Sequence, residues 1–190
     1  MGGAETRKAG GTRAQIQTVA LRLFAEHGYE ATSMREIAEQ LNITKAALYY
    51  HFASKEDIVR ALIETMLAQT SELIQWAEEQ EPGPVLRREV LSRWADIMQD
   101  QGLRMFRFIS ANHVAMREIS PDKSGMSAQL KRLFEILTPP NASVADQLRA
   151  RLSLVVINMV GMAAGDLNAS EDEILAAARQ ISAELLPRGD

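Results

Sequence analysis

The sequence contains no cysteine and few aromatic residues, which make up 5% of its 190 residues. Without thiols the chain has no disulfide, no cysteine nucleophile and no cysteine ligand for zinc, and it suits a reducing compartment. Its longest nearly apolar run, residues 152–164, is broken by Ser153 and Asn158. This run is shorter than the ~20 residues that a membrane-spanning helix requires, and no apolar signal segment follows the N-terminus. We therefore expect a cytoplasmic protein with no membrane partner.

The sequence also lacks the motifs of common enzyme active sites. It contains no HExxH, GxSxG, P-loop or GxGxxG pattern, and its three histidines, His27, His51 and His113, are far apart. No spacing of carboxylates and histidines indicates a metal site. We therefore expect no enzyme activity, no metal and no cofactor.

Net charge gives a weak signal for nucleic acid. The whole chain carries −4, yet residues 1–60 hold eight basic and seven acidic side chains, for a net charge of +1. The remaining residues hold −5. Any nucleic-acid contact must therefore come from a local patch, and binding should depend steeply on salt.

The periodicity of the apolar residues predicts an all-α protein of about nine helices. Ser or Thr followed three residues later by Glu, Gln or Asp marks five candidate helix starts, at Thr12, Ser33, Ser54, Ser143 and Ser170. No alternating strand pattern is present. The predicted helices span 13–27, 34–40, 45–50, 55–79, 85–100, 103–119, 126–137, 144–164 and 171–186.

Residues 32–52 have the pattern of a helix-turn-helix. Two predicted helices are joined by Leu41-Asn42-Ile43, and Asn tolerates the left-handed backbone that such a turn requires. Ala38 is small enough for two helices to cross closely. The second helix of this motif lies in the major groove of DNA.

The region from about residue 13 to 63 resembles the DNA-binding domain of the tetracycline-repressor (TetR) family. The matching residues are Ala20, Leu23, Phe24, Gly28, Tyr29, Thr32, Ile37, Ala38, the run from Thr44 to Phe52, and Lys55. The LYYHF-x-x-K ending makes this resemblance specific. It implies a DNA-binding regulator whose divergent C-terminal domain is helical, binds a ligand and forms dimers.

On this basis we divide the chain into a flexible basic tail (1–12), a three-helix helix-turn-helix domain (13–60) and a larger helical bundle (61–190). Helix starts suit phosphate, and polar or aromatic side chains of the second helix suit base edges and the DNA backbone. The candidate DNA-binding residues are Thr32, Ser33, Thr44, Lys45, Ala46, Tyr49, Tyr50, His51 and Lys55. The alternative is that Tyr49 and Phe52 are core aromatics and Ser33 and Ser54 only helix caps; for Phe52 and Ser54 we favour this alternative.

In the C-terminal part, two patterns suggest function. Two glycines four apart, Gly161 and Gly165, allow another helix to approach closely, and the last two predicted helices are apolar or amphipathic. The predicted dimer interface contains Val155, Met159, Gly161, Met162, Gly165, Ile174 and Ile181; the alternative is that both helices are monomer core. Methionine and aromatic residues also suit a pliable apolar pocket, although plain core is again the alternative. The predicted ligand-binding residues are Met66, Trp94, Met98, Phe106, Phe108, Asn112, His113 and Asn158.

The sequence thus predicts a transcription regulator that binds a palindromic operator as a homodimer. We expect a repressor that a small, mainly apolar effector, neutral or anionic, releases from double-stranded DNA. The alternatives are a helical adaptor protein, or a TetR-like regulator that binds DNA constitutively or activates transcription.

Overall fold

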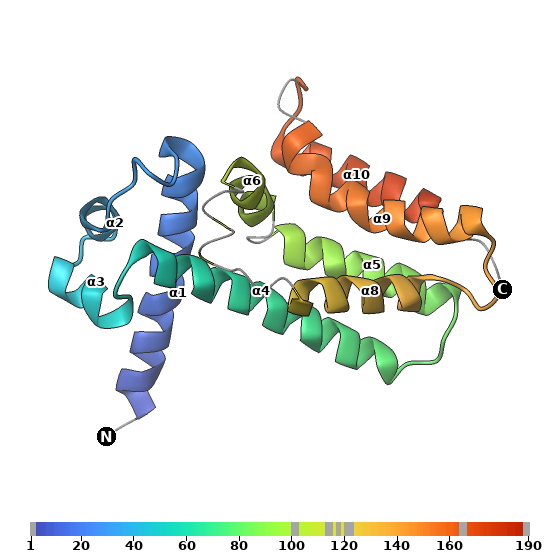
Figure 1. Cartoon of the computed structure of the whole chain (residues 1–190), viewed down its shortest axis with the longest axis horizontal. Helices are drawn as coiled ribbons and strands as arrows, with labels where there is room; N and C mark the ends of the chain where they lie inside the picture. Colours follow the sequence, from blue (N-terminus) through green and yellow to red (C-terminus); the bar gives the residue numbers. More distant parts are fainter. Residues whose placement is uncertain are drawn as a thin grey trace. The chain divides into compact units, whose positions relative to one another are not determined.

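The computed structural model describes residues 3–99, 103–112, 116, 119, 124–163 and 167–187. Within these ranges the secondary structure is helical and contains no strand, as predicted (Figure 1). The described helices are α1 (Gly3–His27), α2 (Met34–Gln40), α3 (Lys45–His51), α4 (Lys55–Glu78), α5 (Pro84–Ile97), α6 (Leu103–Ala111), α8 (Ser124–Leu137), α9 (Val144–Ala163) and α10 (Glu171–Leu185).

Side-chain caps place most of the helix starts where the sequence predicts them. The hydroxyl oxygens of Ser33, Ser54, Ser143 and Ser170 each accept a hydrogen bond from the backbone N–H three residues later. Ser170 and Glu173 form a complete capping box. These bonds satisfy N–H groups that have no partner within the helix.

The start of α1 differs from the prediction. The helix begins at Gly3, so Thr12 lies inside it and residues 3–12 are helical where a flexible tail was predicted. This segment contains Ala4, Glu5, Arg7, Lys8 and Ala9, all good helix formers. Their propensity outweighs the roughly 1 kcal/mol that each interior glycine costs at Gly10 and Gly11.

The chain forms two compact units. Unit 1 consists of residues Met1–Thr65 and Arg107–Pro121, and unit 2 of Met66–Phe106 and Asp122–Asp190. The division falls inside α4, close to the boundary predicted at residue 60. The second segment of unit 1 lies far along the chain from the first, and no local pattern of residues indicates that it belongs there.

An aromatic cluster explains why this second segment joins unit 1. The Phe108 ring is buried and stacks on Phe24, with ring centroids 5.5 Å apart. It also contacts Tyr29 edge-on at 5.7 Å. Phe108 was predicted to bind ligand; instead it fills the core of unit 1, because the aromatic faces of Phe24 and Tyr29 leave its ring no exposed side.

Unit 2 is a bundle with its own core. Its fully buried apolar side chains come from α5, α8 and α9, and include Val90, Leu133, Leu137, Leu154 and Ile157. Polar bonds join helices of this unit at the surface. Arg179 of α10 donates to Asp96 at 2.7 Å, and Gln129 of α8 donates to the Leu67 carbonyl of α4 at 2.9 Å. No helix in the described part of the chain is long and apolar enough to cross a bilayer.

Candidate nucleic-acid interface

The turn between α2 and α3 has the predicted left-handed residue. Asn42 has φ 52°, and the backbone N–H groups of Asn42 and Ile43 donate to the Glu39 and Ala38 carbonyls. Ala38 is buried, so the backbones of the two helices approach each other closely at this point. This backbone, followed by the side-chain cap of α3, confirms the helix-turn-helix of residues 32–52.

The two faces of α3 differ sharply in exposure. Leu48 is fully buried and Phe52, which follows the helix, is 3% exposed. On the other face, Tyr49 is 44% and Tyr50 84% exposed, and Thr44, Lys45 and Ala46 are exposed as well. Tyr49 is therefore a surface residue, whereas Phe52 is a core residue, as we expected. Burial of one face leaves a polar and aromatic surface on the other.

The hydroxyl groups at the helix starts have mainly structural partners. Thr44 accepts the backbone N–H of Ala47, and Ser33 accepts that of Glu36, so both are N-caps of exposed helix ends. Thr32 is 1% exposed, and its hydroxyl donates to the Gly28 carbonyl at 2.9 Å. The side chain of Thr32 thus closes the turn after α1, and its buried hydroxyl has a partner within the chain.

Arg13 of α1 holds the C-terminal end of α3. Its Nη1 donates to the His51 carbonyl at 3.0 Å, and its guanidinium lies 4.2 Å from the centroid of the Phe52 ring. A helix C-terminus carries partial negative charge, so a cation at this carbonyl stabilises it. This role of Arg13 was not predicted, since nothing in the residue order links positions 13 and 51. The pattern of an Arg three residues before the first buried Ile16 is too common to single it out.

Lys55, at the start of α4, makes a second hydrogen bond between a cation and a backbone carbonyl. Its Nζ donates to the Tyr29 carbonyl at 2.7 Å and lies 4.5 Å from the centroid of the Tyr29 ring. We predicted that Lys55 contacts phosphate. That contact stays a prediction, since the bonds to the Tyr29 and Glu30 carbonyls in the turn after α1 use two of the three N–H donors of the ammonium.

Glu56, the residue after Lys55, also bonds Tyr29. The Tyr29 hydroxyl donates to Glu56 Oε1 at 2.8 Å. Burial, and then the bond to Glu56, raises the pKa of the Tyr29 hydroxyl far above its ordinary value. Hydrogen bonds from the Glu56 backbone N–H first, and then from Tyr29 and Ser54, lower the pKa of the Glu56 carboxyl. At neutral pH Tyr29 is therefore a neutral donor to an ionised Glu56.

The predicted ligand-binding residues are divided between the two units. Met66, Trp94, Met98 and Asn158 belong to unit 2, where Trp94 Nε1 donates to Asn158 Oδ1 at 3.1 Å. Phe108 and Asn112 belong to unit 1, and the Asn112 amide donates to the Phe108 carbonyl. His113 and the side chain of Phe106 lie outside the described residues. Trp94 and Met98 are buried core residues, because the side chains of α5, α8 and α9 fill the space around them.

Several predicted dimer residues are exposed in the monomer. Val155, Met159 and Ile181 are 36%, 41% and 49% exposed, and Ile174 is half-buried. They are therefore not simply monomer core. Gly161, Met162 and Gly165 fall outside the part of the chain whose side chains the structure describes.

Similarity to known proteins is strongest over the helix-turn-helix. A model of the family described as "Bacterial regulatory proteins, tetR family" matches residues 16–62. The chain is 38% identical over 82 residues to the HTH-type transcriptional regulator AcrR of Shigella flexneri, which covers 42% of this chain and 38% of that protein. It is 47% identical over 45 residues to the biofilm operon icaADBC negative regulator IcaR of Staphylococcus epidermidis, covering 24% of each. The chain thus spans well under half the length of these two relatives.

Solved structures extend the similarity in fold to nearly the whole chain. The ketosteroid transcriptional regulator KstR2 of Mycobacterium tuberculosis superposes with a TM-score of 0.67 at 18% identity, covering 92% of this chain and 93% of that one. The TetR family regulator PfmR of Thermus thermophilus superposes with a TM-score of 0.58 at 26% identity, covering 90% and 96%. An N-terminal helix-turn-helix followed by a helical domain is therefore the fold of this chain.

We predict that Glu56→Gln destabilises the protein at pH 7 and makes less difference at acid pH. A carboxyl whose pKa is lowered by folding contributes stability above its ordinary pKa, near pH 4, and loses that contribution as pH falls through the lowered value. Because Glu56 is partly exposed, the loss at pH 7 should be about 1 kcal/mol or less. Urea unfolding of parent and variant at pH 7 and pH 3 measures the gap. Glu64→Gln, an exposed carboxylate of the same helix, is the control; a gap for Glu56→Gln that widens toward pH 3 contradicts the assignment.

Proposed function

We propose that this chain is a DNA-binding transcription regulator of the tetR family that acts in the cytoplasm. The family model that matches residues 16–62 and the similarity to AcrR support the proposal. The observation that carries the proposal is the exposed face of α3. Thr44, Lys45, Ala46, Tyr49 and Tyr50 stand on this face, while Leu48 and Phe52 anchor the opposite one. A helix held in this way is suited to the major groove of duplex DNA.

The side chains of this face divide between two roles. The Lys45 ammonium lies 5.5 Å from the centroid of the Tyr49 ring, one helical turn further on, which keeps the long side chain near the helix surface. From there it reaches base edges or phosphate at the first turn of α3. Tyr50, whose ring lies edge-on to the His51 ring at 5.3 Å, offers its hydroxyl to the phosphate backbone.

A single α3 reads too few base pairs to select one operator, so we propose that two copies of the chain act together. Five exposed apolar residues recur every three or four positions along α9. They form what we call the α9 stripe: Val144, Leu148, Leu152, Val155 and Met159. Ile181 of α10 is exposed as well. A row of this length on a single helix face is unusual for a surface that stays in water, and a second copy supplies a matching row by two-fold symmetry.

We propose in addition that the regulator is a repressor whose DNA affinity falls when an effector binds. The name of the IcaR relative describes a negative regulator, which supports the sign of the effect. The structural support for a response to an effector is α4, a single helix of Lys55–Glu78. It begins in unit 1, where Lys55 bonds the Tyr29 carbonyl, and continues into unit 2. A change in the pose of α4 would be transmitted along this helix, provided that the effector binds one pose better than the other.

Lys45→Gln tests the docking of α3. We expect affinity for a duplex selected from genomic DNA to fall about tenfold, its sequence preference to change, and the salt dependence to lose about one unit of slope in log K against log salt. Fluorescence anisotropy of a labelled duplex at several salt concentrations measures all three. Arg88→Gln removes an exposed charge from α5 and should leave binding unchanged. Equal binding by Lys45→Gln and parent would mean that α3 does not face DNA. That result would favour the alternative of a helical adaptor protein.

Leu152→Glu tests the dimer. A carboxylate at the centre of the α9 stripe would be buried without a partner in the paired state, so the variant should sediment as a monomer at micromolar concentration. Its DNA affinity should fall at least tenfold, because the second α3 no longer binds as part of the same particle. Val85→Glu alters an isolated apolar residue that is 72% exposed, and should remain dimeric. A parent protein that is monomeric yet binds DNA specifically would refute this interface.

A further inference from the structure

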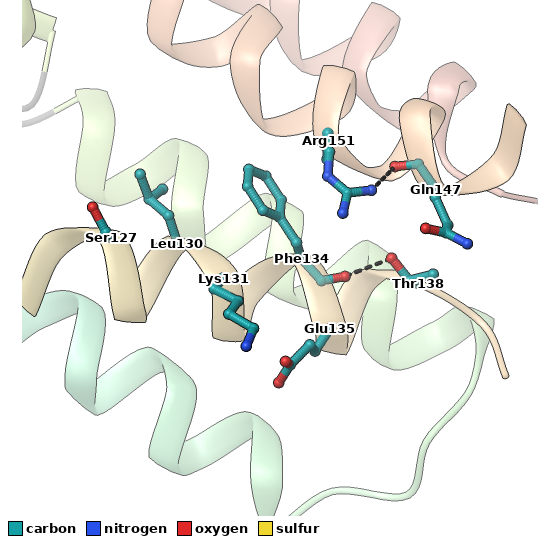
Figure 2. Close-up of a pocket in the computed structure, with 8 residues that line it drawn as sticks. All are labelled: Ser127, Leu130, Lys131, Phe134, Glu135, Thr138, Gln147 and Arg151. Carbon is teal, nitrogen blue, oxygen red and sulfur yellow. Dashed lines mark hydrogen bonds between the residues drawn. The ribbon is translucent and has the colours of Figure 1, made fainter. Parts of the chain in front are cut away.

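A groove of about 570 Å³ lies between α8 and α9 of unit 2 (Figure 2). Its volume is within the range of small-molecule sites, and none of the predicted ligand-binding residues lines it. The α8 side carries Leu130 and Phe134, both half-buried, which form an apolar floor. Gln147 and Arg151 of α9 form the opposite side.

The charges in this groove are unbalanced. Lys131 of α8 and Arg151 of α9 are exposed and take part in none of the ion pairs found among the described residues. Glu135, the carboxylate of the groove, is already paired with Arg132 at 2.8 Å. Two cations thus line the apolar floor outside the ion pairs found in the described part of the chain.

The Arg151 guanidinium is held in place within the groove. It lies 5.5 Å from the centroid of the Phe134 ring and donates through Nη1 to the Gln147 carbonyl at 3.0 Å. These two contacts leave its other N–H groups available and reduce the freedom that binding would otherwise have to remove. Gln147 is fixed in turn, since its Nε2 donates to the Ala142 carbonyl.

We infer that this groove binds a small anion with a flat apolar body, such as an aromatic carboxylate. The Arg151 fork matches the geometry of a carboxylate, and Lys131 adds a second positive charge. Phe134 and Leu130 offer an apolar surface on which an aromatic ring can pack. A neutral compound of the same shape would forgo both cations and bind more weakly.

The groove is connected to α4 by polar bonds, so its ligand fits the role of effector; this part of the inference rests on the proposed function. Gln129 of α8 donates to the Leu67 carbonyl and, at 2.7 Å, to the Ser71 hydroxyl. Arg132 pairs with Glu78 at 2.6 Å. A ligand that changes the separation of α8 and α9 would therefore act on α4 at two points that are about two helical turns or more apart.

The first experiment uses two ligands of one shape. Isothermal titration calorimetry compares 2-naphthoate with 2-naphthamide, which keeps the ring system and lacks the charge. We expect the parent protein to bind naphthoate at least tenfold more tightly than naphthamide. Arg151→Gln and Lys131→Gln should each reduce naphthoate affinity about tenfold and leave naphthamide unchanged. Arg149→Gln is the matched control, because Arg149 lies on the same helix but pairs with Asp146 outside the groove.

These outcomes separate the site from the proposed function. Equal affinities for the two ligands, or naphthoate binding that survives Arg151→Gln, overturn the inference even if the chain binds DNA. Arg151-dependent binding by a chain that never binds DNA would support the site and refute the proposed function. If the site is the effector site, naphthoate lowers the DNA affinity of the parent at least fivefold and that of Arg151→Gln not at all.

Discussion

The arrangement of the helix-turn-helix depends on two cations that each bind a backbone carbonyl. Arg13 donates to the His51 carbonyl at the end of α3, and Lys55 donates to the Tyr29 carbonyl in the turn before α2. Leu48 and Phe52 anchor the buried face of α3. The two bonds add one contact at the end of α3 and one at the turn that precedes α2, and so restrict the orientation of the exposed face. Preorganisation of this kind lowers the entropy that binding must remove.

The same turn links the helix-turn-helix to the later part of the chain. Tyr29 contacts Phe24 and Phe108 through its ring, Glu56 through its hydroxyl and Lys55 through its carbonyl. Phe108 is therefore part of the same core as the helix-turn-helix, although α6 begins in unit 2. At Tyr29, residues from α1, the start of α4 and α6 thus pack together and set the position of the helix-turn-helix. The high pKa of Tyr29 keeps its hydroxyl a donor to Glu56 throughout the neutral range.

Local signals predicted the fold well. Serine caps and apolar periodicity located α2, α4, α9 and α10 to within about one residue, because both signals are properties of neighbouring residues. The start of α1 was placed too late, since Thr12 has the form of a cap and the glycines before it suggested a tail. The exposed face of α3 also followed from the sequence, as the positions of Leu48 and Phe52 determine which side is buried.

Contacts between residues far apart in the chain could not be predicted from the sequence. Arg13 can act as it does only because the backbone of residue 51 lies beside α1. Lys55 bonds a backbone carbonyl, and every residue has one, so the residue types do not indicate this bond. Phe108 and Trp94 were predicted to line one pocket because both are aromatic residues in the C-terminal half. Packing assigns them to different cores. The groove at Arg151 could not be predicted, because its side chains come from two helices and each is by itself an ordinary surface residue.

The central claim, that unit 1 presents α3 to DNA, is tested most directly by amide hydrogen exchange of the full chain with and without a duplex selected from genomic DNA. Exchange slows where a bound partner covers or steadies a helix. The largest slowing should fall in peptides covering residues 32–52, with smaller changes in peptides from α8. Unchanged exchange across 32–52, with slowing concentrated in α8 to α10, would contradict this claim.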